Sequence, residues 1–235
     1  MPLLTLDNVR TYYEIRKGLF SKPLYVKAVD GVTLSLEKGS TLALVGESGC
    51  GKTTLGKTVL RLLEPISGKI IFDGKDITHE PEEKLKWFRR KAQMIFQDPY
   101  SSIDPMHTIK YNLEEPLIIH KIGEDEEERY DKICKALEVV KLTPPEDFIP
   151  KYPHMLSGGQ RQRVNIARAL ILDPEFIVAD EPVTMLDASV RVEILMLLKE
   201  IRERKKISFI YVTHDVATAK YFSQRIAIML SLIHI

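Results

Sequence analysis

The residues with the clearest chemical meaning form a loop whose types and spacing suit a phosphate group. The loop reads Gly46-Glu47-Ser48-Gly49-Cys50-Gly51-Lys52-Thr53-Thr54 and fits the Walker A pattern G-x-x-x-x-G-K-[ST]. Its glycines let the backbone turn tightly, so that successive N–H groups can face an anion. The side chain of Lys52 can reach the β- and γ-phosphates, and the hydroxyl of Thr53 can ligate Mg²⁺. We therefore predict that the chain binds a nucleoside triphosphate.

Two neighbouring acidic residues form a second motif. Residues 176–180 read as a buried apolar strand that ends in Asp180, and Glu181 comes next. Adjacent side chains at the end of a strand point in different directions, so the two carboxylates can serve separate roles. Asp180 suits Mg²⁺ binding, as a Walker B aspartate, and Glu181 suits activating the attacking water as a general base.

A third motif offers a second site for an anion. In Leu156-Ser157-Gly158-Gly159-Gln160, a good helix cap, Ser157, and two glycines precede an expected helix over residues 161–171. Open backbone N–H groups at such a helix start attract anions. An ordinary capped helix is the alternative interpretation of the same residues.

Strands and helices are expected to alternate around these motifs, which indicates an α/β sheet with helices on its faces. A strand over residues 41–45 and a helix over residues 52–63 flank the phosphate loop. Residues 3–9 alternate like an edge strand of a small antiparallel region. The other expected strands are residues 32–36, 69–72, 92–96, 207–212 and 225–229.

The expected helices fall into two groups. Helical patterns run from residue 98 to residue 171, broken at residues 121–123 and 143–153. Further helices are expected over residues 81–90, 189–205 and 215–222. Acidic residues 124–128 suit a solvated helix start favoured by the helix dipole, and Leu137, Val140 and Leu142 suit the core.

Composition and charge limit the possible classes of function. The chain is 44% apolar and 29% charged, as in a globular protein, and its net charge of +1 argues against a nucleic-acid partner. Two cysteines, Cys50 and Cys134, are too few for a disulfide framework and fit a reducing cytoplasm. We expect no secretion signal at residues 1–10, and the longest apolar stretch, residues 226–235, is too short to span a bilayer.

Taken in order, Walker A, Leu-Ser-Gly-Gly-Gln, Walker B and the later His214 resemble the nucleotide-binding domain of ATP-binding cassette (ABC) transporters. The resemblance implies a single ATPase domain over residues 1–235 with a P-loop NTPase (RecA-like) core. It assigns residues 1–96 and 161–229 to the core with its antiparallel β-subdomain, and residues 97–160 to an inserted helical subdomain. Residues 230–235 do not match the family, so we expect a truncated or foreign end there.

The resemblance also implies roles for individual residues. Gln97 matches the Q-loop glutamine that touches Mg²⁺, and His214 matches the switch histidine that senses the γ-phosphate. Asp187 matches the D-loop, although Met185 stands where a small residue is usual. Tyr12 is our choice for stacking on adenine, with Tyr13 as the alternative.

In this family two such domains face head to tail, so each ATP lies between one Walker A loop and the partner's signature. The resemblance thus implies that the chain pairs with itself or with a related ATPase subunit. It assigns contacts with the partner's ATP to Ser157, Gly158, Gly159 and Gln160. It also implies transmembrane permease subunits docked at residues 97–105, an indirect link to a solute-binding protein, and a peripheral place on the cytoplasmic face of the membrane.

Three stretches narrow the resemblance to oligopeptide and dipeptide importers. They are Lys17-Gly18-Leu19-Phe20, residues 26–32 and residues 96–105, and Pro99-Tyr100-Ser101-Ser102 is similar to the second of that system's two ATPase subunits. Nickel and some sugar importers use similar subunits and remain alternatives.

Non-transport ABC ATPases are further alternatives. A DNA-maintenance ATPase would need long heptad coiled coils between Walker A and the signature, which the sequence lacks. A ribosome-associated protein would carry two cassettes in one chain. A catalytically inactive subunit fits poorly with the presence of Lys52, Asp180, Glu181 and His214.

Overall fold

The computed structural model describes residues 1–15, 23–98 and 102–230. The chain divides into two compact units, the first formed by Met1–Leu85 with Ser208–Ile235 and the second by Lys86–Ile207. Some predictions above fall outside the described residues: those on residues 17–20, residues 99–101 and residues 231–235.

The first unit contains a four-stranded antiparallel sheet in the order β2-β1-β4-β5. Its strands are β1 (Leu4–Ile15), β2 (Leu24–Leu36), β4 (Ser67–Phe72) and β5 (Lys75–Asp76). The prediction of an edge strand near the N-terminus was wrong, because β1 pairs with β2 on one side and β4 on the other. Alternating apolar and polar residues indicate that one face of the strand is buried. They do not indicate whether the strand lies at an edge or in the middle of its sheet.

The same unit holds three parallel strands, and their carboxyl ends meet at one edge. They are β3 (Thr41–Gly46), β8 (Ser208–Thr213) and β9 (Arg225–Met229). In this register Val45 lies opposite Thr213 on β8 and Ile228 on β9. Crevices at the carboxyl ends of parallel strands are the usual ligand sites of such sheets.

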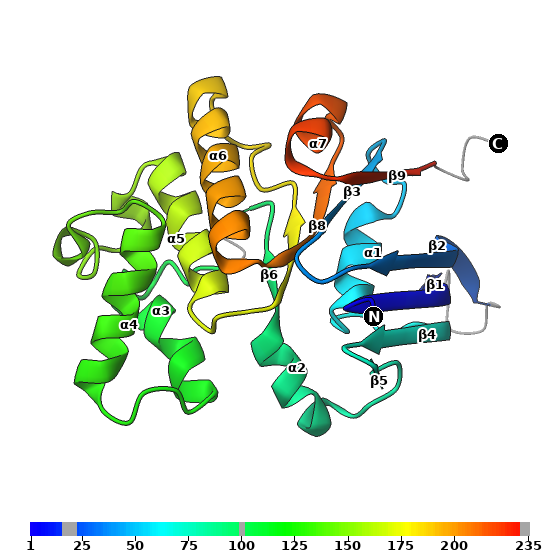
Figure 1. Cartoon of the computed structure of the whole chain (residues 1–235), viewed down its shortest axis with the longest axis horizontal. Coiled ribbons are helices and arrows are strands. Elements are labelled where there is room, and N and C mark those ends of the chain that lie inside the picture. Colours follow the sequence, from blue (N-terminus) through cyan, green and yellow to red (C-terminus); the bar gives the residue numbers. More distant parts are fainter. Residues whose placement is uncertain (16–22, 99–101, 231–235) are drawn as a thin grey trace. The chain divides into compact units, whose positions relative to one another are not determined.

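Helix α1 (Lys52–Val59) follows β3 directly and packs against β1, β2, β3 and β8 (Figure 1). It ends before residue 63, where we expected it to end, because Arg61 adopts a left-handed backbone with φ 53°. The guanidinium of Arg61 donates to the carbonyl of Ile77 at 2.8 Å, so a tertiary contact overrides the helical pattern. Helix α7 (Val216–Phe222) follows β8.

The second unit pairs β6 (Ala92–Ile95) in parallel with β7 (Phe176–Asp180) and surrounds them with helices. The helices are α2 (Lys86–Lys91), α3 (Ile109–Ile119), α4 (Glu126–Val139), α5 (Gly158–Leu170) and α6 (Ala188–Lys205). Helices α3, α4 and α5 pack together, and α5 also contacts β6 and α6 (Figure 1). Within the described part of the chain, no helix combines the length and apolar character needed to span a bilayer.

Two helix starts differ from the prediction. A short 3₁₀ helix, Glu82–Leu85, precedes α2, where we expected one α-helix over residues 81–90. Residues 102–108 are not helical, because Thr108 caps α3 by accepting a hydrogen bond from the backbone of Tyr111.

Other expectations are confirmed. Leu137, Val140 and Leu142 are buried in the core of the second unit. The acidic run opens α4, with Asp125 as its cap and residues 126–128 exposed in its first turn. Negative charge at this position is favoured by the positive end of the helix dipole.

Candidate functional site

The phosphate loop of the first unit closes around the ammonium group of Lys52. This side chain is 5% exposed and donates to the carbonyls of Gly46 at 2.8 Å and Glu47 at 2.7 Å. The loop starts at the end of β3 and stops where α1 begins, at Lys52 itself. A positive charge is therefore fixed beside the helix N-terminus, where an anion is favoured.

Gly51, the last residue before α1, can only be glycine. Its φ is 98°, and a Cβ atom there would lie 2.0 Å from the carbonyl oxygen of Ala28 on β2. Side chains rarely adopt this backbone conformation, and the neighbouring backbone cannot move away cheaply. The glycine thus lets the loop pack against β2 and lets α1 begin at the next residue.

His214 follows the end of β8 and lies at the same sheet edge as the phosphate loop. Thr213 is opposite Val45, so His214 lies one residue beyond the last paired position. The segment is fixed from both sides, because the backbone N–H of Asp215 donates to the Thr213 hydroxyl at 3.0 Å and the Asp215 carboxylate caps α7. His214 itself is exposed.

The two aromatic candidates for adenine have different surroundings. The hydroxyl of Tyr13 lies 3.3 Å from that of Thr54 in the first turn of α1, and 43% of Tyr13 is exposed. The hydroxyl of Tyr12 donates to Asp30 at 2.6 Å, which raises the pKa of Tyr12 and lowers that of Asp30. The ammonium of Lys27 lies 5.5 Å from the centre of the Tyr12 ring. Tyr13 therefore reaches the phosphate-loop helix, whereas Tyr12 belongs to a surface cluster of charges.

In the second unit, the two Walker B residues differ in how far they are buried. Asp180 is 4% exposed at the end of β7, and Glu181 is half-buried. Glu181 adopts a left-handed backbone with φ 43°, which is uncommon for a residue other than glycine and is found disproportionately at functional sites.

Gln97 and Glu181 come together at the edge where β6 and β7 end. Ile95 pairs with Ala179, so each residue lies two positions beyond this pair. The amide of Gln97 lies 3.5 Å from the Glu181 carboxylate, and the hydroxyl of Thr184 donates to the same carboxylate oxygen at 3.0 Å. The structure therefore holds this carboxylate from two directions.

The signature residues form a complete capping box. The Ser157 hydroxyl accepts from the backbone of Gln160 at 3.2 Å, and the Gln160 side chain accepts from the backbone of Ser157 at 3.0 Å. The helix starts at Gly158 and not at residue 161 as predicted, because the cap directly precedes the glycines. A Cβ atom on Gly159 would lie 2.7 Å from Val190, so this glycine also permits close packing of α5 on α6.

Asp187 precedes α6 without capping it through its side chain. The carboxylate side chain is exposed, and Met185 nearby is 63% exposed. Both are available at the surface of the second unit.

Sequence reasoning missed three residues of the second unit. Thr184 holds Glu181, and Gln162 and Asn165 are almost fully buried side chains of α5. The signal for the last two was present in the sequence, because two amides three residues apart interrupt the apolar face of the helix.

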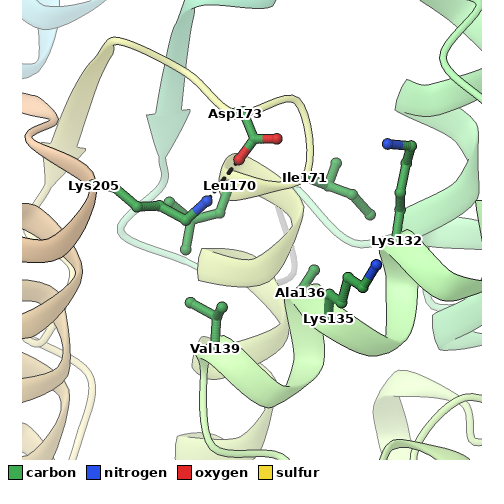
Figure 2. Close-up of a pocket in the computed structure, with 8 residues that line it drawn as sticks. All are labelled: Lys132, Lys135, Ala136, Val139, Leu170, Ile171, Asp173 and Lys205. Carbon is green, nitrogen blue, oxygen red and sulfur yellow. Dashed lines mark hydrogen bonds and ion pairs between the residues drawn. The ribbon is translucent and has the colours of Figure 1, made fainter.

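A pocket of about 200 Å³ lies apart from these motifs, between residues of α4, α5 and α6 (Figure 2). Three of its lining residues are Lys132, Lys135 and Lys205. Lys205 pairs with Asp173 at 2.6 Å and Lys132 with Glu128 at 3.6 Å, so protein carboxylates already neutralise part of this charge. None of the motifs contributes to it.

A family model described as ABC transporter matches residues 29–184. The oligopeptide transport ATP-binding protein AppF of Bacillus subtilis is 45% identical over 97% of this chain and 69% of its own length. The dipeptide transport ATP-binding proteins DppF of Haemophilus influenzae and of Escherichia coli are 43% and 39% identical over 97% of this chain, and over 69% and 67% of their own lengths.

Solved structures agree with this family. The dimeric ATP-binding cassette MJ0796, bound to ADP and Pi in a post-hydrolysis state, superposes with a TM-score of 0.83 at 32% identity, covering 96% of this chain and 94% of that one. The cbiO1 protein from Clostridium perfringens, part of the ABC transporter complex cbiONQ, gives a TM-score of 0.80 at 26% identity, covering 97% and 84%. The expected α/β fold of a P-loop ATPase cassette is confirmed.

We predict that replacing Gly51 with alanine weakens ATP binding by about tenfold or more, because the left-handed backbone and the clash with Ala28 distort the loop. Gly74→Ala is the matched control, since Gly74 has φ 78° but only the Met1 methyl group, 3.8 Å away, near its Cβ position. Titration with a fluorescent ATP analogue checks both. Equal affinities of the two variants would contradict this account of the loop.

Proposed function

Because the chain belongs to the ABC transporter family, we propose that it is the ATP-hydrolysing subunit of an importer for oligopeptides or dipeptides. One observation carries the substrate class: relatives named for peptide transport match 97% of the chain at 39–45% identity. ATP is the ligand that this subunit binds, and the peptide would pass through partner proteins.

The non-transport alternatives are not favoured. The longest helix of the described residues, α6, has 18 residues, and it lies after the signature. A DNA-maintenance ATPase would carry long coiled-coil helices between Walker A and the signature.

In our proposal, residues 46–54 hold the triphosphate of ATP. The backbone N–H groups of the loop and of the first turn of α1 bind the phosphate oxygens. Lys52 exchanges its bonds with the loop carbonyls for bonds with the β- and γ-phosphates. This exchange is favourable because a hydrogen bond between an ammonium group and a phosphate joins two opposite charges, whereas a hydrogen bond to a carbonyl joins a charged group to a neutral one.

The oxygen donors present suit Mg²⁺, which completes the substrate when bound by neutralising charge that develops on the phosphates. We propose Thr53, Gln97 and Asp180 as the side chains that contact it. Among the described residues, no group of three or more His, Cys, Asp or Glu side chains could hold a metal alone. Mg²⁺ at such sites is typically bound through one or two carboxylates together with substrate phosphates and water, and Asp180 is the carboxylate of the proposed set.

We assign water activation to Glu181. Its carboxylate is positioned by Thr184 and lies 3.5 Å from Gln97, so it can accept a proton from water while remaining oriented. His214, exposed at the edge where the phosphate loop begins, is assigned to contact the γ-phosphate. Most of the catalysis then comes from positioning and charge stabilisation.

We propose that the active form is a head-to-tail dimer with a second copy or a related ATPase subunit. Ser157, Gly158, Gly159 and Gln160 form an exposed or half-exposed helix start that can contact the partner's ATP. Asp187, exposed and not used as a side-chain cap, is assigned to the seam between the two chains. One chain alone would contain two half-sites.

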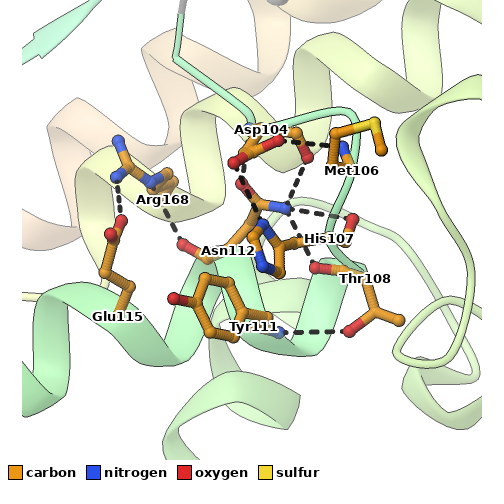
Figure 3. Close-up of polar contacts among 8 residues, drawn as sticks. All are labelled: Asp104, Met106, His107, Thr108, Tyr111, Asn112, Glu115 and Arg168. Carbon is orange, nitrogen blue, oxygen red and sulfur yellow. Dashed lines mark hydrogen bonds and ion pairs between the residues drawn. The ribbon is translucent and has the colours of Figure 1, made fainter.

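The permease is proposed to dock at residues 97–105 and the segment that follows, on the cytoplasmic face of the membrane. Figure 3 shows how the buried amide of Asn112 fixes this segment, accepting from the backbone of Asp104 at 2.7 Å and donating to the carbonyl of Thr108 at 2.9 Å. Met106 is 79% exposed in this segment, and its backbone N–H donates to the Asp104 carboxylate at 2.8 Å. Methionine is common at adaptable binding surfaces because its side chain is flexible, so we propose Met106 as a contact of the permease.

Helix α5 is tied to the same segment. Arg168 donates to the carbonyl of Asn112 at 3.1 Å and pairs with Glu115 at 2.8 Å (Figure 3). A rotation of the signature helix would therefore move the docking surface with it, which gives ATP-driven dimerisation a route to the permease.

For adenine, the contact of Tyr13 with Thr54 favours Tyr13 over Tyr12, our first choice. We predict that Tyr13→Ala costs about 1–3 kcal/mol of ATP-binding free energy, the usual worth of base stacking on an aromatic ring. Tyr13→Phe should bind normally, and Tyr12→Ala should change the affinity by less than about twofold. A larger effect of Tyr12→Ala than of Tyr13→Ala would restore Tyr12 as the stacking residue.

ATP hydrolysis tests both the proposed dimer and the role of Glu181. The rate per chain of purified protein should rise with protein concentration, because two chains complete each site. Glu181→Gln should lower kcat by about 10²–10⁴-fold and leave ATP bound, since only proton acceptance is lost. A Glu181→Gln variant as fast as the wild type would remove Glu181 from its assigned role.

A further inference from the structure

Helix α5 buries two polar side chains that the proposed function does not use. Gln162 and Asn165 are each 1% exposed, and they lie one helical turn apart among apolar residues such as Ile166. Burying an amide is costly unless all its hydrogen-bonding groups find partners. Their partners therefore indicate what these two residues do.

Asn165 connects three segments of the second unit. Its side-chain oxygen accepts from the hydroxyl of Ser102 at 2.7 Å. Its side-chain nitrogen donates to the carbonyl of Phe96 at 3.2 Å and to the side-chain oxygen of Gln162 at 3.3 Å. The amide thus satisfies both its acceptor and its two N–H donors.

Gln162 continues this network to the other side of the site. Its side-chain nitrogen donates to the carbonyl of Pro182 at 2.7 Å. Phe96 directly precedes Gln97, and Pro182 directly follows Glu181. The two amides therefore hold the backbone next to both members of the Gln97–Glu181 pair, and none of their bonds goes to the pair itself.

We propose that Gln162 and Asn165 are positioning residues for ATP hydrolysis that link the signature helix to Gln97 and Glu181. The inference rests on the proposed function, in which Glu181 activates water and the first turn of α5 meets the partner's ATP. A shift of α5 on contact with that ATP passes through the two amides to the carbonyls of Phe96 and Pro182. Contact of the signature of a chain with the partner's ATP thereby changes the position of Gln97 and Glu181 in the same chain.

The size of the effect follows from the geometry of catalysis. Glu181 is already 3.5 Å from Gln97, at the limit of a hydrogen bond, so a small backbone shift breaks or makes this contact. A misplacement of about 1 Å in a catalytic group can cost about 10²-fold in rate. Neither amide belongs to the phosphate loop or its flanking elements, so ATP affinity should hardly change.

The test compares Asn165→Leu and Gln162→Met, which keep the approximate size of each side chain, with Arg163→Met. Arg163 lies on the same helix and also binds a carbonyl, that of Val140 at 2.9 Å, but it does not contact the two catalytic segments. We expect kcat to fall about 10- to 100-fold in the first two variants, with KM for ATP within about twofold of the wild type. Arg163→Met should keep both constants.

A double-mutant cycle with Gln97→Ala separates positioning from general damage. If Asn165 acts through the Gln97 segment, Asn165→Leu should cost much less in the Gln97→Ala background than in the wild type. Fully additive losses, or unchanged kcat in both amide variants, would overturn the proposal.

Hydrogen exchange decides the inference even if the wild-type chain hydrolyses no ATP, a result that would count against the proposed function instead. In the isolated chain, Asn165→Leu should speed exchange about tenfold in a peptide covering residues 94–98, and Gln162→Met should do so in a peptide covering residues 181–186. Arg163→Met should leave both peptides unchanged. Equal exchange in all variants would contradict a network that fixes these segments.

Discussion

The parallel pairing of β3 with β8 and β9 is the constraint on which the phosphate site depends. It brings the end of β3, where the loop begins, and the end of β8, where His214 follows, to one edge of the sheet. Strands β3 and β8 are almost entirely buried, and the loop that follows β3 closes around the buried ammonium of Lys52 through the carbonyls of Gly46 and Glu47. We propose that the backbone N–H groups of this loop and the lysine ammonium form the anion site.

In the second unit, helix α5 contacts several of the segments that carry the motifs. Helix α5 offers its capped first turn to solvent, while its buried side holds the backbone beside Gln97 and Glu181 and its last turns hold α3 through Arg168. A rigid helix transmits a displacement at one end to all its contacts, because packed interiors deform little. In our proposal, this helix therefore connects the partner's nucleotide, the carboxylate of Glu181 and the permease-docking segment.

Motifs with fixed spacing could be predicted from the sequence because their chemistry is local. The strand before Lys52, the cap at Ser157 and the strand ending in Asp180 all follow from short-range rules and are present in the structure. Long-range contacts could not be predicted: the pairing of β1 on both sides, the early end of α1 at Arg61, and the choice between Tyr12 and Tyr13 depend on residues far along the chain. The same holds for Gln162 and Asn165, whose carbonyl partners are on distant segments.

We propose that each chain contains two half-sites, and mixing two inactive variants tests this proposal. Lys52→Ala removes the phosphate-binding half and Ser157→Arg blocks the signature half, so each variant alone should be inactive. Mixed in equal amounts, they should recover about a quarter of the wild-type rate, because half of the dimers are mixed and each mixed dimer has one complete site. A mixture that stays inactive beside an active wild type, with both variants folded, would contradict the account.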